Sequence, residues 1–352
     1  MKLNRSSIER LTRMNIRATL ALTVLLVVLI TGGRAGWAGE VFTNPLLDSG
    51  ADPWVTYDRG YYYYTNTMGD RLQIWKTKDI TKLRSAVTKV VWRAPANGPN
   101  SASIWAPELH RLNGKWYLYF SGSDRAHDDD EHRHQFVLEN AAEDPLSGRW
   151  VERGMLVTGR TGIDGTVFSD HGQLYFVYSA YVGANSDLVI APMVNPWTLS
   201  MTQVDIAKPT FDWEKQGGRQ ILEGPEFLQG RRGQRILLYS ASACWSDDYS
   251  IGMLTAAPGA NLLEAASWKK NSQPVFKASS QNGVYAPGHN GLFKSPDGRE
   301  DWIIYHANSA PGQRCDSRRS PRIQRFTWRD DGLPDFGVPV PAGVPLQGPS
   351  GR

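Results

Sequence analysis

Three acidic residues stand at matching positions of a repeated pattern, and carboxyl groups brought together in this way can carry out acid–base catalysis. Asp52 lies in the motif ADPWV, Asp164 in IDGTVF and Glu223 in LEGPEF. In such a set, an ionised carboxylate can activate a water molecule while a protonated carboxyl group donates its proton to a leaving oxygen. A third carboxylate nearby raises the pKa of the acid, because a second negative charge there is unfavourable. These residue types therefore suggest hydrolysis of a glycosidic bond, although any one of them alone could be an ordinary salt-bridged or solvated acid.

The elements that must position these acids repeat five times, at intervals of about 60 residues. WAPEL, with Pro107, and PGHNGLF, with His289, complete the set, and the steps from Asp52 through Pro107, Asp164 and Glu223 to His289 are 55, 57, 59 and 66 residues. Each motif precedes an aromatic, strand-like run, which is typical of one four-stranded sheet, or blade, per repeat. We therefore expect an all-β fold, a five-bladed β-propeller with four antiparallel strands per blade. Because the first strand of each blade lines the central channel, the three acids should converge there.

The first 38 residues have the features of a signal peptide. A basic stretch is followed by an apolar run from Ala18 to Ile30, and small residues precede the expected cleavage after Ala38. The apolar run is short for a membrane span, and an uncleaved anchor is the alternative. These residues carry six Lys/Arg and one acid, so removing their +5 takes the net charge from +4 to about −1. We therefore expect a secreted protein, extracellular or periplasmic, without stable membrane association after cleavage and without a nucleic-acid partner.

The rest of the chain fits one domain. Five repeats fill residues 39–345, and a mobile tail is expected at 346–352, which lacks periodicity. The two cysteines, Cys244 and Cys315, fall in loops that leave the second strands of adjacent blades, on one face of the propeller. In an exported protein this placement favours a disulfide over a pair of free thiols.

Taken together, the ordered motifs resemble glycoside hydrolase family 43, the five-bladed propellers that include arabinofuranosidases, arabinanases and β-xylosidases. The motifs that carry the resemblance are, in order, GADPWV, IWAPELH, IDGTVF, LEGPEF, LLYSASACWSDDYSIGMLTA, GHNGLF, IIYHA and RIQRFTWRDDGLPDFGVPV. The resemblance implies that Asp52 is the general base, that Asp164 adjusts the pKa of the acid and orients it, and that Glu223 is the general acid. It also implies an inverting reaction, in which base and acid stand roughly 6.5–9.5 Å apart to admit a water molecule.

Within that family, the chain is most similar to secreted exo-1,5-α-L-arabinofuranosidases. The WAPELH context, YSASACW, SWKKNSQPVFK and the ending that begins RIQRFTW carry this finer similarity. Two features depart from the pattern. Ala286 stands where many relatives have glycine, and the acidic loop 124–134 is elongated. The implied partner is arabinan or an arabinose-containing hemicellulose oligosaccharide.

Further residues are candidates for binding the substrate. Trp54 and Trp105 lie beside the leading positions and could pack against sugar faces, with packing between blades as the alternative for both. Arg322 matches an active-site arginine of the family, and Arg318 and Arg319 are close enough to be confused with it.

No cofactor is expected, although the family resemblance allows a structural calcium ion in the channel. The matching histidine, His289, binds a central water molecule or ion in relatives, and a purely structural histidine is the alternative. Glu108 and His110 could be mistaken for metal ligands, but alternation along the strand makes Glu108 a hydrogen-bonded strand residue. The histidines and aspartates of the loop 127–134 are expected to be solvated.

The leading prediction is thus a secreted exo-α-L-arabinofuranosidase that releases arabinose from 1,5-α-arabinan or arabino-oligosaccharides. A β-xylosidase or an endo-arabinanase on the same scaffold is the alternative within the enzyme class, and the long loop 124–134 favours the closed pocket that exo action needs. A non-catalytic carbohydrate-binding propeller is the alternative from another class, but binding alone would require none of the three acids. A sialidase propeller is disfavoured, since that reaction needs an arginine cluster and a tyrosine nucleophile.

Overall fold

The computed structural model describes residues 39–351. The predicted signal peptide, residues 1–38, lies outside the described residues. Within residues 39–351, no helix is both long enough and apolar enough to cross a membrane.

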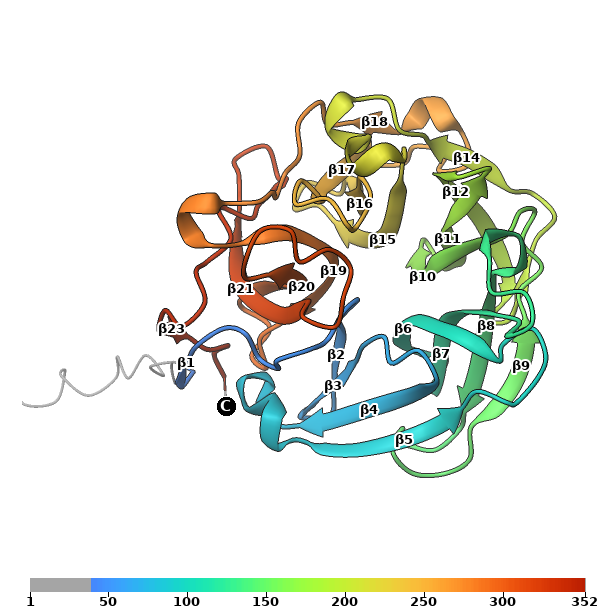
Figure 1. The fold of residues 1–352 in the computed structure, drawn as a ribbon, viewed down its shortest axis with the longest axis horizontal. Helices are drawn as coiled ribbons and strands as arrows, with labels where there is room; N and C mark the ends of the chain where they lie inside the picture. Colours follow the sequence, from blue (N-terminus) through green and yellow to red (C-terminus); the bar gives the residue numbers. More distant parts are fainter. Residues whose placement is uncertain (1–38, 352) are drawn as a thin grey trace, which may run out of the picture. The chain divides into compact units, whose positions relative to one another are not determined.

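Five antiparallel sheets are arranged around a central axis, which confirms the predicted all-β, five-bladed propeller (Figure 1). Blade one contains β2 (Trp54–Asp58), β3 (Tyr61–Thr65), β4 (Arg71–Thr77) and β5 (Val87–Arg93). Blade two contains β6 (Ala102–Leu112), β7 (Lys115–Ser123), β8 (His134–Asn140) and β9 (Val151–Met155). Blade three contains β10 (Gly162–Asp170), β11 (Gln173–Val182) and β12 (Asn185–Asn195), with β13 (Thr198–Leu199) and β14 (Val204–Ala207) both pairing with β12.

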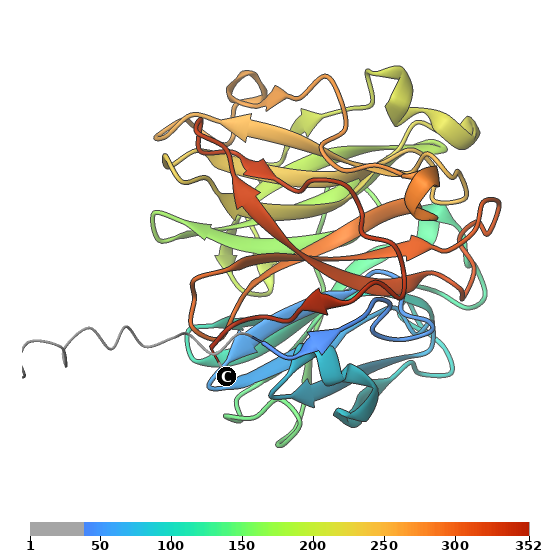
Figure 2. The same ribbon diagram turned by 90° about the vertical axis from the view of Figure 1, so that its left-hand side faces the viewer.

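Blade four contains β15 (Leu222–Gln229), β16 (Arg235–Ala241), β17 (Ser250–Ala256) and β18 (Lys269–Lys270). Blade five contains β19 (Tyr285–Lys294), β20 (Asp301–Asn308), β21 (Ser320–Trp328) and β22 (Pro334–Asp335). The only helical elements in the described residues are short 3-10 turns: Ile80–Ser85, Asp130–His132, Asp212–Glu214, Gln216–Gly218, Ala265–Ser267 and Ser280–Asn282. The leading strands β2, β6, β10, β15 and β19 lie nearest the centre, and the connecting loops gather at the two faces (Figures 1 and 2).

Tight turns join the first and second strands of blades one, two and three. At 59–60, 113–114 and 171–172, a residue with φ between 48° and 49° is followed by a glycine with φ between 80° and 83°. Two successive left-handed residues form the turn whose twist matches that of a two-stranded ribbon, and glycine takes the second position without steric cost. These turns set the register that points the leading motifs toward the channel.

Aromatic and aliphatic side chains fill the spaces between neighbouring blades. Between blades three and four, for example, the rings of Phe168 and Phe227 stack with centroids 4.0 Å apart. The ring closes between blades five and one, where Tyr62 packs edge-on against Phe293 at 5.7 Å. Burial of this apolar surface between blades is the main stabilising term that holds the blades at fixed angles.

The two ends of the described chain meet beside blade five. β1 (Val41–Phe42) pairs with β23 (Leu346–Gln347), and the Asn44 side chain exchanges hydrogen bonds with the backbone of Ile323 at 2.8 and 3.0 Å. Ser350 also bonds to Asp297. The packed chain thus continues past residue 345, which was the expected end of the propeller. Residues 346–347 form a strand that pairs with residues 41–42.

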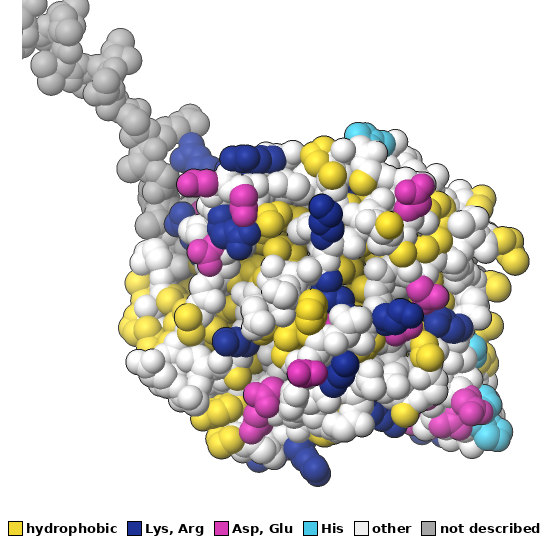
Figure 3. Space-filling view, turned by 90° about the horizontal axis from the view of Figure 1, so that it is seen from above, with side chains coloured by type: hydrophobic (Ala, Val, Ile, Leu, Met, Phe, Trp, Pro, Cys, Tyr) yellow, Lys and Arg dark blue, Asp and Glu magenta, His cyan; other side chains and the backbone are white. Residues whose placement is uncertain are grey.

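A disulfide joins Cys244 to Cys315, as the placement of their loops predicted. It ties the loop after β16 in blade four to the loop after β20 in blade five. On the face shown in Figure 3, Lys and Arg side chains lie among Asp and Glu and do not gather into a single basic patch.

Candidate active site

The leading strands share a backbone feature at the mouth of the channel. One residue of each leading motif has a positive φ: Asp52 (55°), Ala106 (43°), Asp164 (58°), Gly224 (52°) and His289 (46°). Positive φ is uncommon for residues other than glycine, and it is tolerated where the surrounding structure enforces it, often at functional sites. In blades two to five this residue coincides with an irregularity in the pairing between the first and second strands. The resulting bulge re-aims the side chains at the channel.

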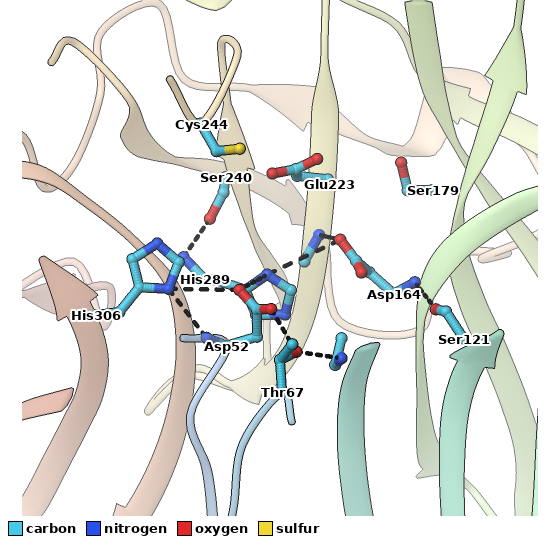
Figure 4. A network of polar contacts seen from close by, with 12 residues as sticks. Asp52, Thr67, Ser121, Asp164, Ser179, Glu223, Ser240, Cys244, His289 and His306 are labelled. Atoms are coloured by element: carbon cyan, nitrogen blue, oxygen red, sulfur yellow. Dashed lines mark hydrogen bonds and ion pairs between the residues drawn. The ribbon is translucent and has the colours of Figure 1, made fainter. Parts of the chain in front are cut away.

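The structure brings the three predicted acids together in one cavity of about 340 Å³. Asp52, Asp164 and Glu223 line it, together with His289 and Trp105. They come from blades one, three, four, five and two, so every blade contributes a predicted residue. Figure 4 shows Asp52, Asp164 and Glu223 facing a common space around His289. The volume lies at the lower end of the range for small-molecule sites and suits a single sugar ring better than a long chain.

Asp52 is held as a carboxylate by its neighbours. The Thr67 hydroxyl donates to Oδ2 at 2.6 Å, and Arg319 Nη1 donates to Oδ1 at 3.3 Å. His289 Nδ1 lies 3.4 Å from the same oxygen. Burial alone would raise the pKa of Asp52, but the positive charges of His289 and Arg319 outweigh it and hold the pKa well below its usual range. The Asp52 carboxyl is therefore ionised and available to accept a proton.

His306 supports the backbone of Asp52 as a neutral ring. The Asp52 amide donates to His306 Nδ1 at 3.0 Å, so this nitrogen carries a lone pair. Burial, followed by the nearby charge of Arg319, holds the pKa of His306 well below its usual value. The distance of 3.4 Å from Nδ1 to Asp52 Oδ1 is consequently a close contact between a neutral ring and a carboxylate and not an ion pair.

Asp164 lies deeper, between its own blade and blade four. Its amide donates to the Ser121 hydroxyl at 2.9 Å, and its Oδ2 accepts from the Gly224 amide at 3.2 Å. His289 Nδ1 lies 3.8 Å from Oδ2. Burial raises the pKa of Asp164, and the negative charge of Glu223 adds to the effect although His289 opposes it. Asp164 and Glu223 thus compete for protons at neighbouring positions.

Glu223 is the acid whose surroundings favour the protonated form without a direct cation. Tyr249 Oη donates to Glu223 Oε1 at 2.6 Å, and the ring of Tyr249 is fully buried. Burial raises the pKa of Glu223, while the hydrogen bond from Tyr249 partly opposes the rise. Asp52 and Glu223 therefore differ in the direction of their pKa shifts, which is the arrangement that separates a base from an acid at one pH.

A network of charged side chains crosses the rim on the side of blades two and three. Asp130, from the acidic loop, accepts from Arg133 and also from Arg219 Nη1 at 3.2 Å. The guanidinium of Arg133 lies over the ring of Trp105, with 4.3 Å between its carbon and the ring centroid. All four side chains line the cavity. The elongated loop is thus tied across the mouth, and Trp105 forms part of its wall.

Two residues predicted for substrate binding lie elsewhere. Trp54 donates from Nε1 to the Leu109 carbonyl at 3.1 Å and packs on His110, so it belongs to the contact between blades one and two. Arg322 is fully buried within β21 and donates to the Ser309 hydroxyl at 2.8 Å. Neither lines the cavity.

The arginine that lines the cavity beside Asp52 is Arg319 and not Arg322. Because β21 begins at Ser320, Arg319 is still in the loop and reaches Asp52, whereas Arg322 follows the strand into the protein interior. Thr67 and Tyr249 were also missed. Each lies in a loop and meets its acid only through the fold, so no local pattern marks it.

His289 Nδ1 lies between the carboxyl groups of Asp52 and Asp164, at 3.4 and 3.8 Å. Among residues 39–351, no group of three or more His, Cys, Asp or Glu side chains is arranged to hold a metal ion. The charges of Asp52 and Asp164 raise the pKa of His289 against the opposing effect of burial, and a protonated ring would repel a cation. A calcium ion in the channel stays a prediction from the family resemblance, and no step is derived through it.

Lower in the channel, Glu108 is a hydrogen-bonded strand residue, as the alternation along its strand predicted. His110 Nε2 lies 2.7 Å from Glu108 Oε2. Burial raises the pKa of Glu226, and the negative charge of Glu108 raises it further.

Comparison with known proteins identifies the family to which the chain belongs. The family model for "Glycosyl hydrolases family 43" matches residues 42–334, and the chain belongs to that family. It is a glycoside hydrolase by family, as the resemblance in the sequence indicated.

Individual relatives narrow the comparison. The chain is 38% identical over 349 residues to an extracellular exo-α-(1→5)-L-arabinofuranosidase from Streptomyces avermitilis, covering 94% of this chain and 72% of the relative. It is 39% identical over 321 residues to α-L-arabinofuranosidase 43 from Humicola insolens, covering 86% of this chain and 64% of the relative. Among solved structures, an α-L-arabinofuranosidase from Lactobacillus brevis superposes with a TM-score of 0.80 at 35% identity, covering 86% of this chain and 98% of the other.

Proposed function

We propose that this protein is a secreted, inverting, exo-acting α-L-arabinofuranosidase that releases arabinose from 1,5-α-arabinan or arabino-oligosaccharides. The observation that carries the proposal is the opposite direction of the pKa shifts of Asp52 and Glu223 around a cavity the size of one sugar. The names of the relatives support the substrate class, and the word extracellular in one of them supports secretion.

In this proposal, Asp52 acts as the general base. Its ionised carboxylate takes a proton from a water molecule, which attacks the anomeric carbon from one face of the ring. Thr67 and Arg319 orient the carboxylate through the two bonds described above and keep it charged. Proton transfer by such positioned groups contributes about 10²–10⁴-fold to the rate.

Glu223 acts as the general acid and protonates the leaving oxygen on the opposite face. Asp164, whose amide is fixed by Ser121 and whose carboxyl faces Gly224, discourages ionisation of Glu223 by its proximity. Two carboxyl groups and a water molecule suffice for this reaction, which uses no cofactor.

Exo action follows from the closed side of the cavity. The Asp130–Arg219 contact spans from the acidic loop to the segment before β15, so a polymer cannot pass straight across the mouth on that side without breaking it. A single terminal arabinose can enter from the other side.

Product analysis tests the proposal. The mature chain is incubated with linear 1,5-arabinan, arabino-oligosaccharides and xylo-oligosaccharides, and the products are followed from the first minutes. Arabinose alone is the expected product. Oligosaccharides would instead indicate an endo-arabinanase, xylose would indicate a xylosidase, and no release at all would indicate a binding propeller.

Two substitutions test the roles. Asp52→Asn and Glu223→Gln should each raise the barrier by about 3–5 kcal/mol without loss of fold, with Asp70→Asn, an exposed carboxylate outside the cavity, as the control. The Glu223 variant should be partly spared on substrates with very good leaving groups, which need little protonation. An active Asp52→Asn variant would remove Asp52 from the role of base.

A further inference from the structure

Trp245 stands at the junction of two cavities on the rim. It lines the catalytic cavity and also a neighbouring one of about 440 Å³, whose other lining residues are Arg314, Cys315 and Asp316. Since Trp245 and Cys315 line both, the two cavities are neighbours on the rim. Trp245 is 36% exposed, and no other tryptophan in residues 39–351 is exposed to this degree.

The exposed ring is nonetheless held in place from several sides. Its Nε1 donates to the Gly217 carbonyl at 2.7 Å, and the guanidinium of Arg219 lies 5.7 Å from its ring centroid. Gly217 has a φ of 80°, and a Cβ there would lie 3.0 Å from the indole nitrogen, so the two segments approach closely. On the other side, the preceding residue, Cys244, is fixed by the disulfide. A rigid aromatic ring left open to solvent costs little conformational entropy when it binds a ligand.

Trp245 lies on the same side of the pocket as Glu223, the proposed general acid. Glu223 is the second residue of β15 in blade four, and Trp245 follows β16 of the same blade. Figure 4 shows Cys244, next to Trp245 in sequence, on the same side of the pocket as Glu223. Because the general acid protonates the leaving oxygen, the leaving part of the substrate must lie next to Glu223.

We propose that Trp245 is the platform on which the leaving arabinosyl unit of a 1,5-linked chain stacks, with the 440 Å³ cavity receiving the units beyond it. This assignment rests on the proposed function and specifies its substrate as a chain and not a lone side substituent. Aromatic faces pack well against the C–H faces of a sugar, and the indole also offers a polar edge.

The opposite direction is less suitable for a neutral sugar chain. A cavity of about 710 Å³ on the side of blades two and three is lined mostly by charged groups of the acidic loop and by Arg219. A chain entering there would have to cross the contact between Asp130 and Arg219. Desolvating such charges without replacing their partners is unfavourable.

The test compares two substrates that share the arabinose to be released. Arabinotriose carries sugar units on the leaving side, whereas α-L-arabinofuranosyl fluoride has a single atom there. For Trp245→Ala, we expect kcat/KM on arabinotriose to fall about tenfold relative to kcat/KM on the fluoride, mainly through KM. Trp245→Phe keeps an aromatic face and should restore most of the lost ratio. Met201→Ala, which removes a side chain 93% exposed that lines no described cavity, should leave the ratio unchanged.

Each outcome separates the platform from the proposed function. An unchanged ratio in Trp245→Ala would overturn the platform and leave the arabinofuranosidase proposal intact. An unchanged ratio there with a tenfold drop in Arg219→Ala would place the chain in the charged cavity instead. Failure of the unmodified protein to hydrolyse both arabinosides would overturn both proposals. Equal losses on both substrates in Trp245→Ala would show a disturbed loop and would also refute the platform.

Discussion

The hydrogen bond from Tyr249 to Glu223 gives a prediction with a definite sign. Tyr249→Phe removes the phenolic donor, which lies 2.6 Å from Glu223 Oε1, and leaves the buried ring in place. This donor stabilises the ionised carboxylate and lowers the pKa of Glu223. Without it, the pKa of Glu223 should rise.

The size of the shift follows from the strength of such a bond. Hydrogen bonds to charged groups contribute about 1.5–3 kcal/mol, and one pKa unit corresponds to about 1.36 kcal/mol. The expected rise is therefore about one to two units. Because the general acid must be protonated, activity falls as the pH rises through this pKa. The alkaline limb of the pH profile should consequently move upward by at least about one unit.

The assay is the pH profile of kcat/KM on arabinobiose, whose leaving group requires protonation. The alkaline limb of the profile reflects the titration of Glu223 and Asp164 together, because the pKa values of both carboxyl groups are raised and the two groups interact. The rate at the optimum should also fall modestly, because a weaker acid donates less readily.

Tyr239→Phe is the matched control. Tyr239 is another fully buried tyrosine of blade four, and its hydroxyl donates to the Glu214 carboxylate at 2.8 Å, outside the cavity. This variant should lose stability but keep the wild-type pH profile. An alkaline limb that stays in place or moves downward in Tyr249→Phe would refute the role of Glu223 as the acid.

The remaining predictions concern the other supports of the pocket. Arg319→Gln removes a cation 3.3 Å from Asp52, so the pKa of Asp52 should rise and activity should be lost about one pH unit earlier on acidification, as an acidic pH profile would show. Replacing Cys244 and Cys315 by serine opens a loop of 71 residues and should lower the free energy of unfolding by about 2–4 kcal/mol in denaturant titrations. Gly288→Ala would place a Cβ 2.1 Å from the ring of Tyr249, the tyrosine that donates to Glu223. The free energy of unfolding, measured by thermal denaturation, should fall by about 1–3 kcal/mol.

Each of these has a contrary outcome. Arg318→Gln, on the exposed neighbouring arginine paired with Asp316, should keep the acid limb in place, and an equal shift in both arginine variants would argue against a specific effect on Asp52. A disulfide-free variant as stable as the parent would mean that the loops are already fixed by their packing. If Gly288→Ala unfolds at the same temperature as the unmodified protein, the ring of Tyr249 can move aside.

The repeat in the sequence determined much of the fold. Motifs that recur at steps of about 60 residues indicate repeats that fold alike and make equivalent contacts. The number of blades and the inner position of each leading motif therefore follow from the spacing. The convergence of Asp52, Asp164 and Glu223 on the channel followed from the same equivalence of positions. The placement of both cysteine loops on one face followed too, because strand direction sets it, and this placement favoured the disulfide that the structure contains.

The direction of individual side chains depended on the tertiary structure. Trp54 sits two residues after Asp52, yet it turns into the contact between blades, where its indole nitrogen finds the Leu109 carbonyl. Arg319 lies in the loop just before β21, whereas Arg322 lies within that strand. The start of the strand is set by its pairing with β20. Spacing along the chain does not encode such a boundary.

What the sequence by itself determined, then, is the set of blades and the three acids that meet at their axis, because periodicity specifies equivalent positions. Only the tertiary structure decided which of these acids is ionised. Asp52 meets Arg319 from blade five and Thr67 from its own blade, whereas Glu223 meets the neutral hydroxyl of Tyr249. A pKa depends on burial and on charges a few ångströms away. Arg319 reaches Asp52 only where blade five closes on blade one, and Tyr249 reaches Glu223 from a loop that folds back over its own blade.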